Sequence, residues 1–156
     1  MLVTPLPVER MIMPIEPIAS QVQQLHDTFS SGKTRPMEWR VTQLSQIKNM
    51  LAEQESRFQD ALKNDLNKGD FEAWTSEIGF TIGDVDHTLA HLKAWMKPRK
   101  VSTPMFAQPG KSFSLPEPLG TVLIIGAWNY PIQLVLGPLT AAFAAESPES
   151  PTALPK

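Results

Sequence analysis

Asn129 occupies a position in this sequence where a ligand-binding or catalytic side chain would be expected. It follows an apolar run at residues 121–125 and a glycine, and Tyr130-Pro131 comes directly after it. Open α/β sheets place their ligands just beyond the carboxyl ends of buried strands. An amide there can donate a hydrogen bond without titrating. The same position also suits the N-cap of a helix with proline in its first turn, and the residues alone favour the cap.

A second candidate is the pair His87 and His91, four residues apart on a predicted helix with Asp84 nearby. Two histidines at that spacing share a helix face and could hold a metal ion. No third ligand is evident, so a solvated helix face is favoured and we expect no metal. His26 is a lone histidine beside an apolar helix face, which favours a structural role.

The composition excludes several kinds of functional site and partner. The 156 residues contain no Cys, which excludes disulfides, thiolate metal sites and a thiol nucleophile from the sequence as given. The formal net charge of −2 provides no basic surface for nucleic acid and no attraction to anionic membranes. Pro5 and Pro7 interrupt any leader-like apolar run. We therefore expect neither a nucleic-acid nor a membrane partner, and a cytoplasmic location by default.

Hydrophobic periodicity predicts three helices before Pro98. The first begins after Pro17 and ends near Gly32, and the second runs from Pro36 for about seven turns. The third carries an apolar stripe from Trp74 to Met96. Gly79 and Gly83 lie inside this third helix, where each should cost roughly 1 kcal/mol against Ala. We expect another backbone to pack closely against them.

The sequence changes character after Pro98. Residues 97–111 are rich in proline and basic side chains and indicate an extended connection. Residues 111–115 alternate polar and apolar side chains, which predicts a short half-buried strand. Residues 121–125 do not alternate, which is typical of a strand covered on both faces. Residues 131–145 predict a helix that is kinked or restarted at Pro138.

Three segments resemble the N-terminal part of aldehyde dehydrogenases of the class 3, fatty-aldehyde-dehydrogenase-like branch. They are Gly32-Lys33-Thr34-Arg35-Pro36 with Trp39-Arg40, Ala61 to Lys68 with Phe71-Glu72-Ala73, and Glu117-Pro118-Leu119-Gly120 through Trp128-Asn129-Tyr130-Pro131. Trp95-Met96-Lys97-Pro98 is similar to bacterial members. The resemblance covers about residues 15–145, and the third segment is the most specific.

The resemblance implies an α/β fold, with a mostly helical N-terminal subdomain followed by the first strand, turn and helix of a Rossmann-like domain. The expected segments are an irregular N-terminus (1–14), the helical subdomain (15–97), an extended connection with a short strand (98–120), the start of the NAD-binding domain (121–145) and a disordered tail (146–156). The short strand would belong to the family's oligomerisation region. Full-length relatives would be homodimers.

The resemblance also implies a reaction, the oxidation of an aldehyde to a carboxylic acid with NAD or NADP. A Cys thiolate attacks the aldehyde, hydride leaves to the nicotinamide, and a Glu activates water to hydrolyse the thioester. It makes Asn129 a catalytic donor to the oxyanion, in preference to the cap. It places Ile125, Gly126, Ala127 and Trp128 in the cofactor cleft, although the residues alone favour a buried strand end with a glycine turn.

The family pattern stops after Ala145. The Cys, the general-base Glu and the groups that hold the cofactor ribose and pyrophosphate have no counterpart in the sequence. We therefore expect a truncated or frame-shifted dehydrogenase product that is inactive alone. An alternative is a non-catalytic helical module that pairs with intact dehydrogenase subunits or another partner. A weaker third possibility is a small helical metal-binding protein.

Overall fold

The computed structural model describes residues 17–118 and 120–145. Its elements are mainly helical. In chain order they are α1 (Ile18–Ser30), α2 (Met37–Glu53), α3 (Glu55–Leu66), α4 (Asp70–Ala73), the π-helical turn η1 (Trp74–Ile78), α5 (Gly79–Trp95), β1 (Arg99–Val101), the 3-10 turn η2 (Met105–Ala107), β2 (Ser112–Ser114) and α6 (Gln133–Ala145). The predicted mostly helical N-terminal subdomain is confirmed, and of the predicted strand, turn and helix that follow it the turn and the helix are present.

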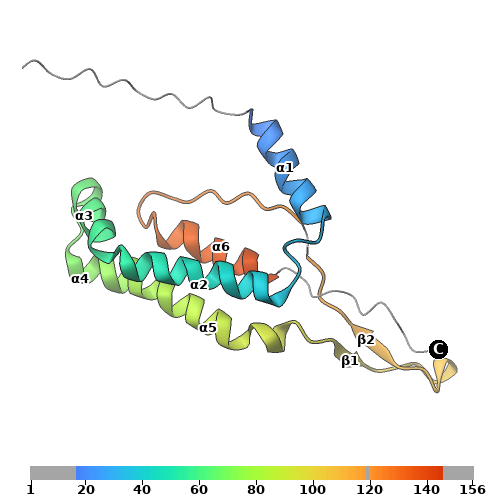
Figure 1. Cartoon of the computed structure of the whole chain (residues 1–156). Helices are drawn as coiled ribbons and strands as arrows, with labels where there is room; N and C mark the ends of the chain where they lie inside the picture. The colour runs from blue at the N-terminus through green and yellow to red at the C-terminus, as the bar shows by residue number, and fades with distance from the viewer. Residues whose placement is uncertain (1–16, 119, 146–156) are drawn as a thin grey trace, which may run out of the picture.

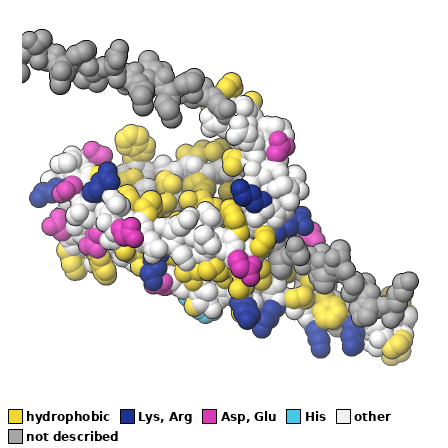
Figure 2. Space-filling model, viewed as in Figure 1, with side chains coloured by type: hydrophobic (Ala, Val, Ile, Leu, Met, Phe, Trp, Pro, Cys, Tyr) yellow, Lys and Arg dark blue, Asp and Glu magenta, His cyan; other side chains and the backbone are white. Residues whose placement is uncertain are grey.

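The core lies where α2, α5 and α6 pack against one another (Figure 1). Its buried members come from the apolar stripes of α2, η1 and α5: Leu44, Ile47, Leu51, Ile78, Val85 and Leu92. Half-buried side chains of α6, among them Leu136 and Phe143, pack on this cluster. Figure 2 shows hydrophobic side chains gathered across the middle of the face that α2 and α6 share. Burial of these stripes is the main stabilising term for the helical layer.

Helix α1 forms at the predicted place, but its apolar face remains largely open. Ile18, Val22 and Leu25 are exposed, and none of the side chains of α1 is buried. Within residues 17–118 and 120–145, its C-terminal end approaches other segments, where Leu25 and Phe29 line a hollow together with Thr121. In Figure 1 the helix projects away from the three packed helices.

The second predicted helix is two helices in the structure. Gln54, with φ −108° and ψ 17°, leaves the helical region and separates α2 from α3. Leu51 and Phe58 lie seven residues apart on either side of the break, which is two helical turns. The apolar spacing therefore continues through Gln54, and periodicity could not reveal the interruption.

The third predicted helix is formed by α4, the π-helical turn η1 and α5, which follow one another from Asp70 to Trp95. The expectation of a backbone packed against its two glycines is wrong. A Cβ at Gly79 would lie 2.9 Å from ring atoms of Trp74, so an indole of the same helical segment fills that space. A Cβ at Gly83 would meet nothing within 4 Å.

The chain after Pro98 forms a two-stranded antiparallel hairpin. The predicted strand near residues 111–115 is confirmed as β2, but β1 within the predicted extended connection was missed. Arg99 pairs with Ser114, and Val101 with Ser112. The hairpin extends beyond the helices in Figure 1.

Residues 121–125 were predicted as a buried strand, and within the described part of the chain they pair with no other strand. Leu123 and Ile125 are each 85% exposed. A strand exists through its hydrogen-bonded neighbours, and no described strand pairs with this segment to supply them. The helix predicted from residue 131 forms as α6 from Gln133 and continues through Pro138.

Two predicted segments, residues 1–14 and 146–156, lie outside the described residues. Among the residues that are described, no helix is both long and apolar enough to cross a membrane.

Candidate functional site

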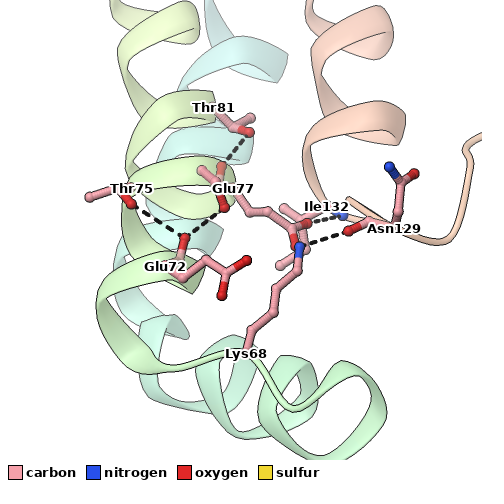
Figure 3. Close-up of polar contacts among 8 residues, drawn as sticks. Lys68, Glu72, Thr75, Glu77, Thr81, Asn129 and Ile132 are labelled. Atoms are coloured by element: carbon pink, nitrogen blue, oxygen red, sulfur yellow. Dashed lines mark hydrogen bonds and ion pairs between the residues drawn. The ribbon is translucent and has the colours of Figure 1, made fainter.

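Asn129 lies in the turn between residues 121–125 and α6. Its side chain is exposed, and its backbone carbonyl accepts a hydrogen bond of 2.7 Å from Lys68 Nζ. Figure 3 shows the amide group of Asn129 directed away from Lys68 and Glu77. The backbone of this residue is thus held to the helical layer while its amide remains available to a ligand.

The helix-cap interpretation of Asn129 is wrong in this structure. Helix α6 begins at Gln133, and the Tyr130 carbonyl accepts the hydrogen bond from the backbone N–H of Leu134 at 2.9 Å. The side chain that hydrogen-bonds the backbone at this end of the helix is the carboxylate of Glu77. Its Oε2 accepts a hydrogen bond of 2.8 Å from the backbone N–H of Ile132. A carboxylate satisfies a free N–H there and interacts favourably with the positive end of the helix.

Glu77 belongs to a buried ion pair that sequence reasoning missed. Its side chain is fully buried, that of Lys68 is 8% exposed, and Lys68 Nζ lies 2.5 Å from Glu77 Oε1. The ammonium also lies 3.8 Å from the centre of the Tyr130 ring, within cation–π range. The available signal was a glutamate beside Ile78 in an apolar stripe, where an unpaired charge is not expected.

Three of the four predicted cofactor residues line one cavity of about 570 Å³. Gly126, Ala127 and Trp128 form one wall, and α3 contributes side chains that include Phe58 and Leu62. Ile125 is not part of this lining. The cavity is mainly apolar, and its described lining contains one carboxylate and no cation.

Gly126 is required by the close approach of the turn to α6. A Cβ at this position would collide with the side chain of Val135. The glycine predicted from the turn pattern therefore lets the segment before Asn129 lie directly on the first turn of α6.

The histidine pair does not form a metal site in the described part of the chain, where no group of three or more His, Cys, Asp or Glu side chains could hold an ion. His91 Nδ1 instead lies 2.7 Å from the carbonyl oxygen of His87. His26 Nδ1 lies 3.5 Å from the hydroxyl of Thr121, at the edge of hydrogen-bond range.

Comparison with known proteins gives a consistent result. The sequence pattern of the aldehyde dehydrogenase family matches residues 16–147. Aldehyde dehydrogenase family 3 member B1 from Bos taurus is 43% identical over 131 residues, which cover 84% of this chain. Aldehyde dehydrogenase family 3 comG from Dictyostelium discoideum is 41% identical over 128 residues and 82% of this chain.

A solved structure agrees with the sequence comparisons. The substrate-bound state of Staphylococcus aureus AldH superposes with a TM-score of 0.81 at 36% identity, and the match covers 85% of this chain and 29% of that one. The chain spans about 28% of the length of the bovine relative. Family pattern, sequence identity and fold therefore agree over nearly all described residues, and the chain belongs to the aldehyde dehydrogenase family.

Proposed function

We propose that this chain supplies the N-terminal part of an NAD(P)-dependent aldehyde dehydrogenase, in which Asn129 donates a hydrogen bond to the oxygen of the reacting aldehyde. The observation that carries the proposal is the placement of Asn129. Its backbone is held by Lys68, and its exposed amide is directed away from the helical layer. A fixed amide donor stabilises the charge that develops on the carbonyl oxygen when a nucleophile attacks.

The proposal assigns only part of the cofactor site to this chain. The apolar wall at Gly126, Ala127 and Trp128 suits one face of a flat ring, but no cation lines the described cavity to meet a pyrophosphate. We infer that these three residues border the nicotinamide end and that other parts of the enzyme hold the phosphates. When bound, the cofactor accepts the hydride. Family membership leaves the choice between NAD and NADP open.

Aldehyde substrates, of medium or long aliphatic kind, and a homodimeric full-length enzyme also belong to the proposal. The hairpin of β1 and β2 supports the second point, because it projects from the helices and exposes Val101 and Phe113. A cytoplasmic location and a bacterial-like origin remain predictions from the sequence alone.

A polypeptide of these 156 residues has no thiol and is expected to produce no NADH or NADPH from a long-chain aldehyde. A hybrid in which residues 16–147 replace the matching segment of the bovine relative is expected to turn over. The measurement is cofactor reduction by each purified protein. Clear turnover by the chain alone, or an inactive but folded hybrid, would contradict the proposal.

A second candidate function is a helical module that pairs with intact dehydrogenase subunits. It is favoured by the apolar side chains exposed along residues 122–128, where Trp128 is 87% exposed. Such patches mark interfaces or aggregation sites. Size-exclusion chromatography of the chain alone and mixed with the bovine relative tests this function. Co-elution supports pairing, and a folded monomer in both runs counts against it.

A further inference from the structure

The ion pair of Lys68 and Glu77 joins the loop after α3 to η1, and both residues precede the Asn129 turn by more than fifty residues. Neither side chain is accessible enough for water to stabilise its charge. Removing two charges from water is expensive unless each finds a partner and further hydrogen bonds. Here both conditions are met, because each member of the pair makes at least one more polar contact (Figure 3).

The local backbone fixes both members of the pair. Asn67 adopts the left-handed conformation (φ 54°) that ends α3, and the N–H of Lys68 donates to the carbonyl of Leu62 at 3.3 Å. Glu77 lies in the π-helical turn η1, a feature often found at functional sites. Glu77 is therefore carried on a helical turn, and Lys68 on a three-residue loop whose backbone is hydrogen-bonded to α3.

The contacts of the pair converge on one short segment. Lys68 Nζ donates to the carbonyl of Asn129, and Glu77 Oε2 accepts the N–H of Ile132. The ring of Tyr130 lies against the ammonium between these two points. The pair thus binds the backbone on both sides of Tyr130-Pro131, while the side-chain amide of Asn129 is directed away from it.

We propose that Lys68 and Glu77 are positioning residues that fix the orientation of the Asn129 amide for catalysis. Apolar side chains of similar volume could stabilise a buried site equally well. They could not bond the carbonyl of Asn129 or the N–H of Ile132, and those bonds set the direction of the turn. The proposal has a mechanical part, that the pair fixes the orientation of the turn, and a catalytic part, that this orientation raises kcat. Only the catalytic part rests on the proposed function, because the mechanical part concerns this chain alone.

The mechanical part is tested by NMR on the full chain, with Lys68→Met as the variant. The expected result is shifted backbone and side-chain amide signals of Asn129, because its carbonyl loses the Lys68 donor. Amide hydrogen exchange at Ile132 should rise at least tenfold relative to core amides, because Glu77 loses the cation that holds its carboxylate beside this N–H. Leu92→Ala is the control, because it removes a buried core side chain near the far end of α5, fifteen residues after Glu77. Glu77→Gln, which keeps the shape of the side chain, replaces Lys68→Met if that variant does not fold. Unmoved turn signals in a folded variant would overturn the proposal.

The catalytic part is tested in the hybrid enzyme. Lys68→Met is expected to lower kcat at least tenfold with KM changed less than threefold, and Lys68→Arg to restore part of the loss. Combined with Asn129→Ala it should lower kcat little further, because both changes remove the same donor. Unchanged kcat in Lys68→Met, while Asn129→Ala lowers it strongly, would refute positioning. If Asn129→Ala itself has no effect, the proposed function fails, and the exchange data still decide the mechanical part.

Discussion

Arg40 should be a stability determinant of the helical layer, because its fully buried guanidinium binds the end of α6. Its Nη1 donates to the carbonyl of Ala144 at 3.3 Å, and its Nη2 to the carbonyl of Arg35 at 3.0 Å. It lies at the opposite end of α6 from Glu77. A cation at a helix C-terminus satisfies free carbonyls and complements their partial negative charge.

The size of the effect of Arg40→Met follows from these contacts. Hydrogen bonds to a charged group contribute about 1.5–3 kcal/mol each. Removing the guanidinium takes these bonds from the carbonyls of Ala144 and Arg35. Methionine keeps the aliphatic volume and removes the desolvation of a buried charge, which offsets part of the loss. The net expectation is a decrease of about 2–3 kcal/mol in the free energy of unfolding.

The assay is urea denaturation followed by far-ultraviolet circular dichroism. With a slope of about 1.5–2 kcal/mol per molar urea, the midpoint should fall by roughly 1–2 M. Arg57→Met is the control. Arg57 is exposed and bonds Gln54 Oε1 at 2.7 Å, so its replacement should change stability by less than about 0.5 kcal/mol. Equal and small effects of the two substitutions would refute the role assigned to Arg40.

Three further predictions concern packing. Gly83→Ala should raise the free energy of unfolding by about 0.5–1 kcal/mol, since open space surrounds this helical position. Gly79→Ala should lower the free energy of unfolding, because the new Cβ would collide with Trp74. Thermal melts of both variants test the two signs. Leu44→Ala, at a fully buried position, should lose about 2–5 kcal/mol in urea denaturation, and a loss under 1 kcal/mol would contradict the core described above. Replacing Leu123 and Ile125 together by Ser should leave the melting temperature unchanged and reduce light scattering on concentration, because both side chains are exposed; a large drop in melting temperature would mean that they are packed.

Most helices could be predicted from the sequence, because apolar side chains at helical spacing mark one face of each helix; α2 and α5 bury that face, whereas α1 leaves it largely open. The break at Gln54 could not, since one non-helical residue leaves the spacing of Leu51 and Phe58 intact. Residues 121–125 have the composition of a strand that is covered on both faces, but they form no strand in the structure. Strand formation depends on hydrogen-bonded neighbours, and the composition of a segment does not reveal whether they are present.

The candidate site could be predicted only in part. The turn pattern singled out Asn129, Gly126, Ala127 and Trp128, and the last three line one cavity in the structure, while their roles stay predictions. It could not reveal the pairing of Lys68 with Glu77, which depends on how α3 ends and on a π-helical turn. The burial of Glu77 can be recognised only in the folded structure, where Lys68 lies beside it.

The most direct test of the account is the turnover of Asn129→Ala in the hybrid enzyme, with Asn64→Ala on the exposed surface of α3 as the control. Loss of one oxyanion donor typically lowers kcat about 100- to 1,000-fold. We predict a decrease in that range for Asn129→Ala, a KM within about threefold, and no change for Asn64→Ala. A kcat for Asn129→Ala within about threefold of the unsubstituted hybrid would contradict the central claim.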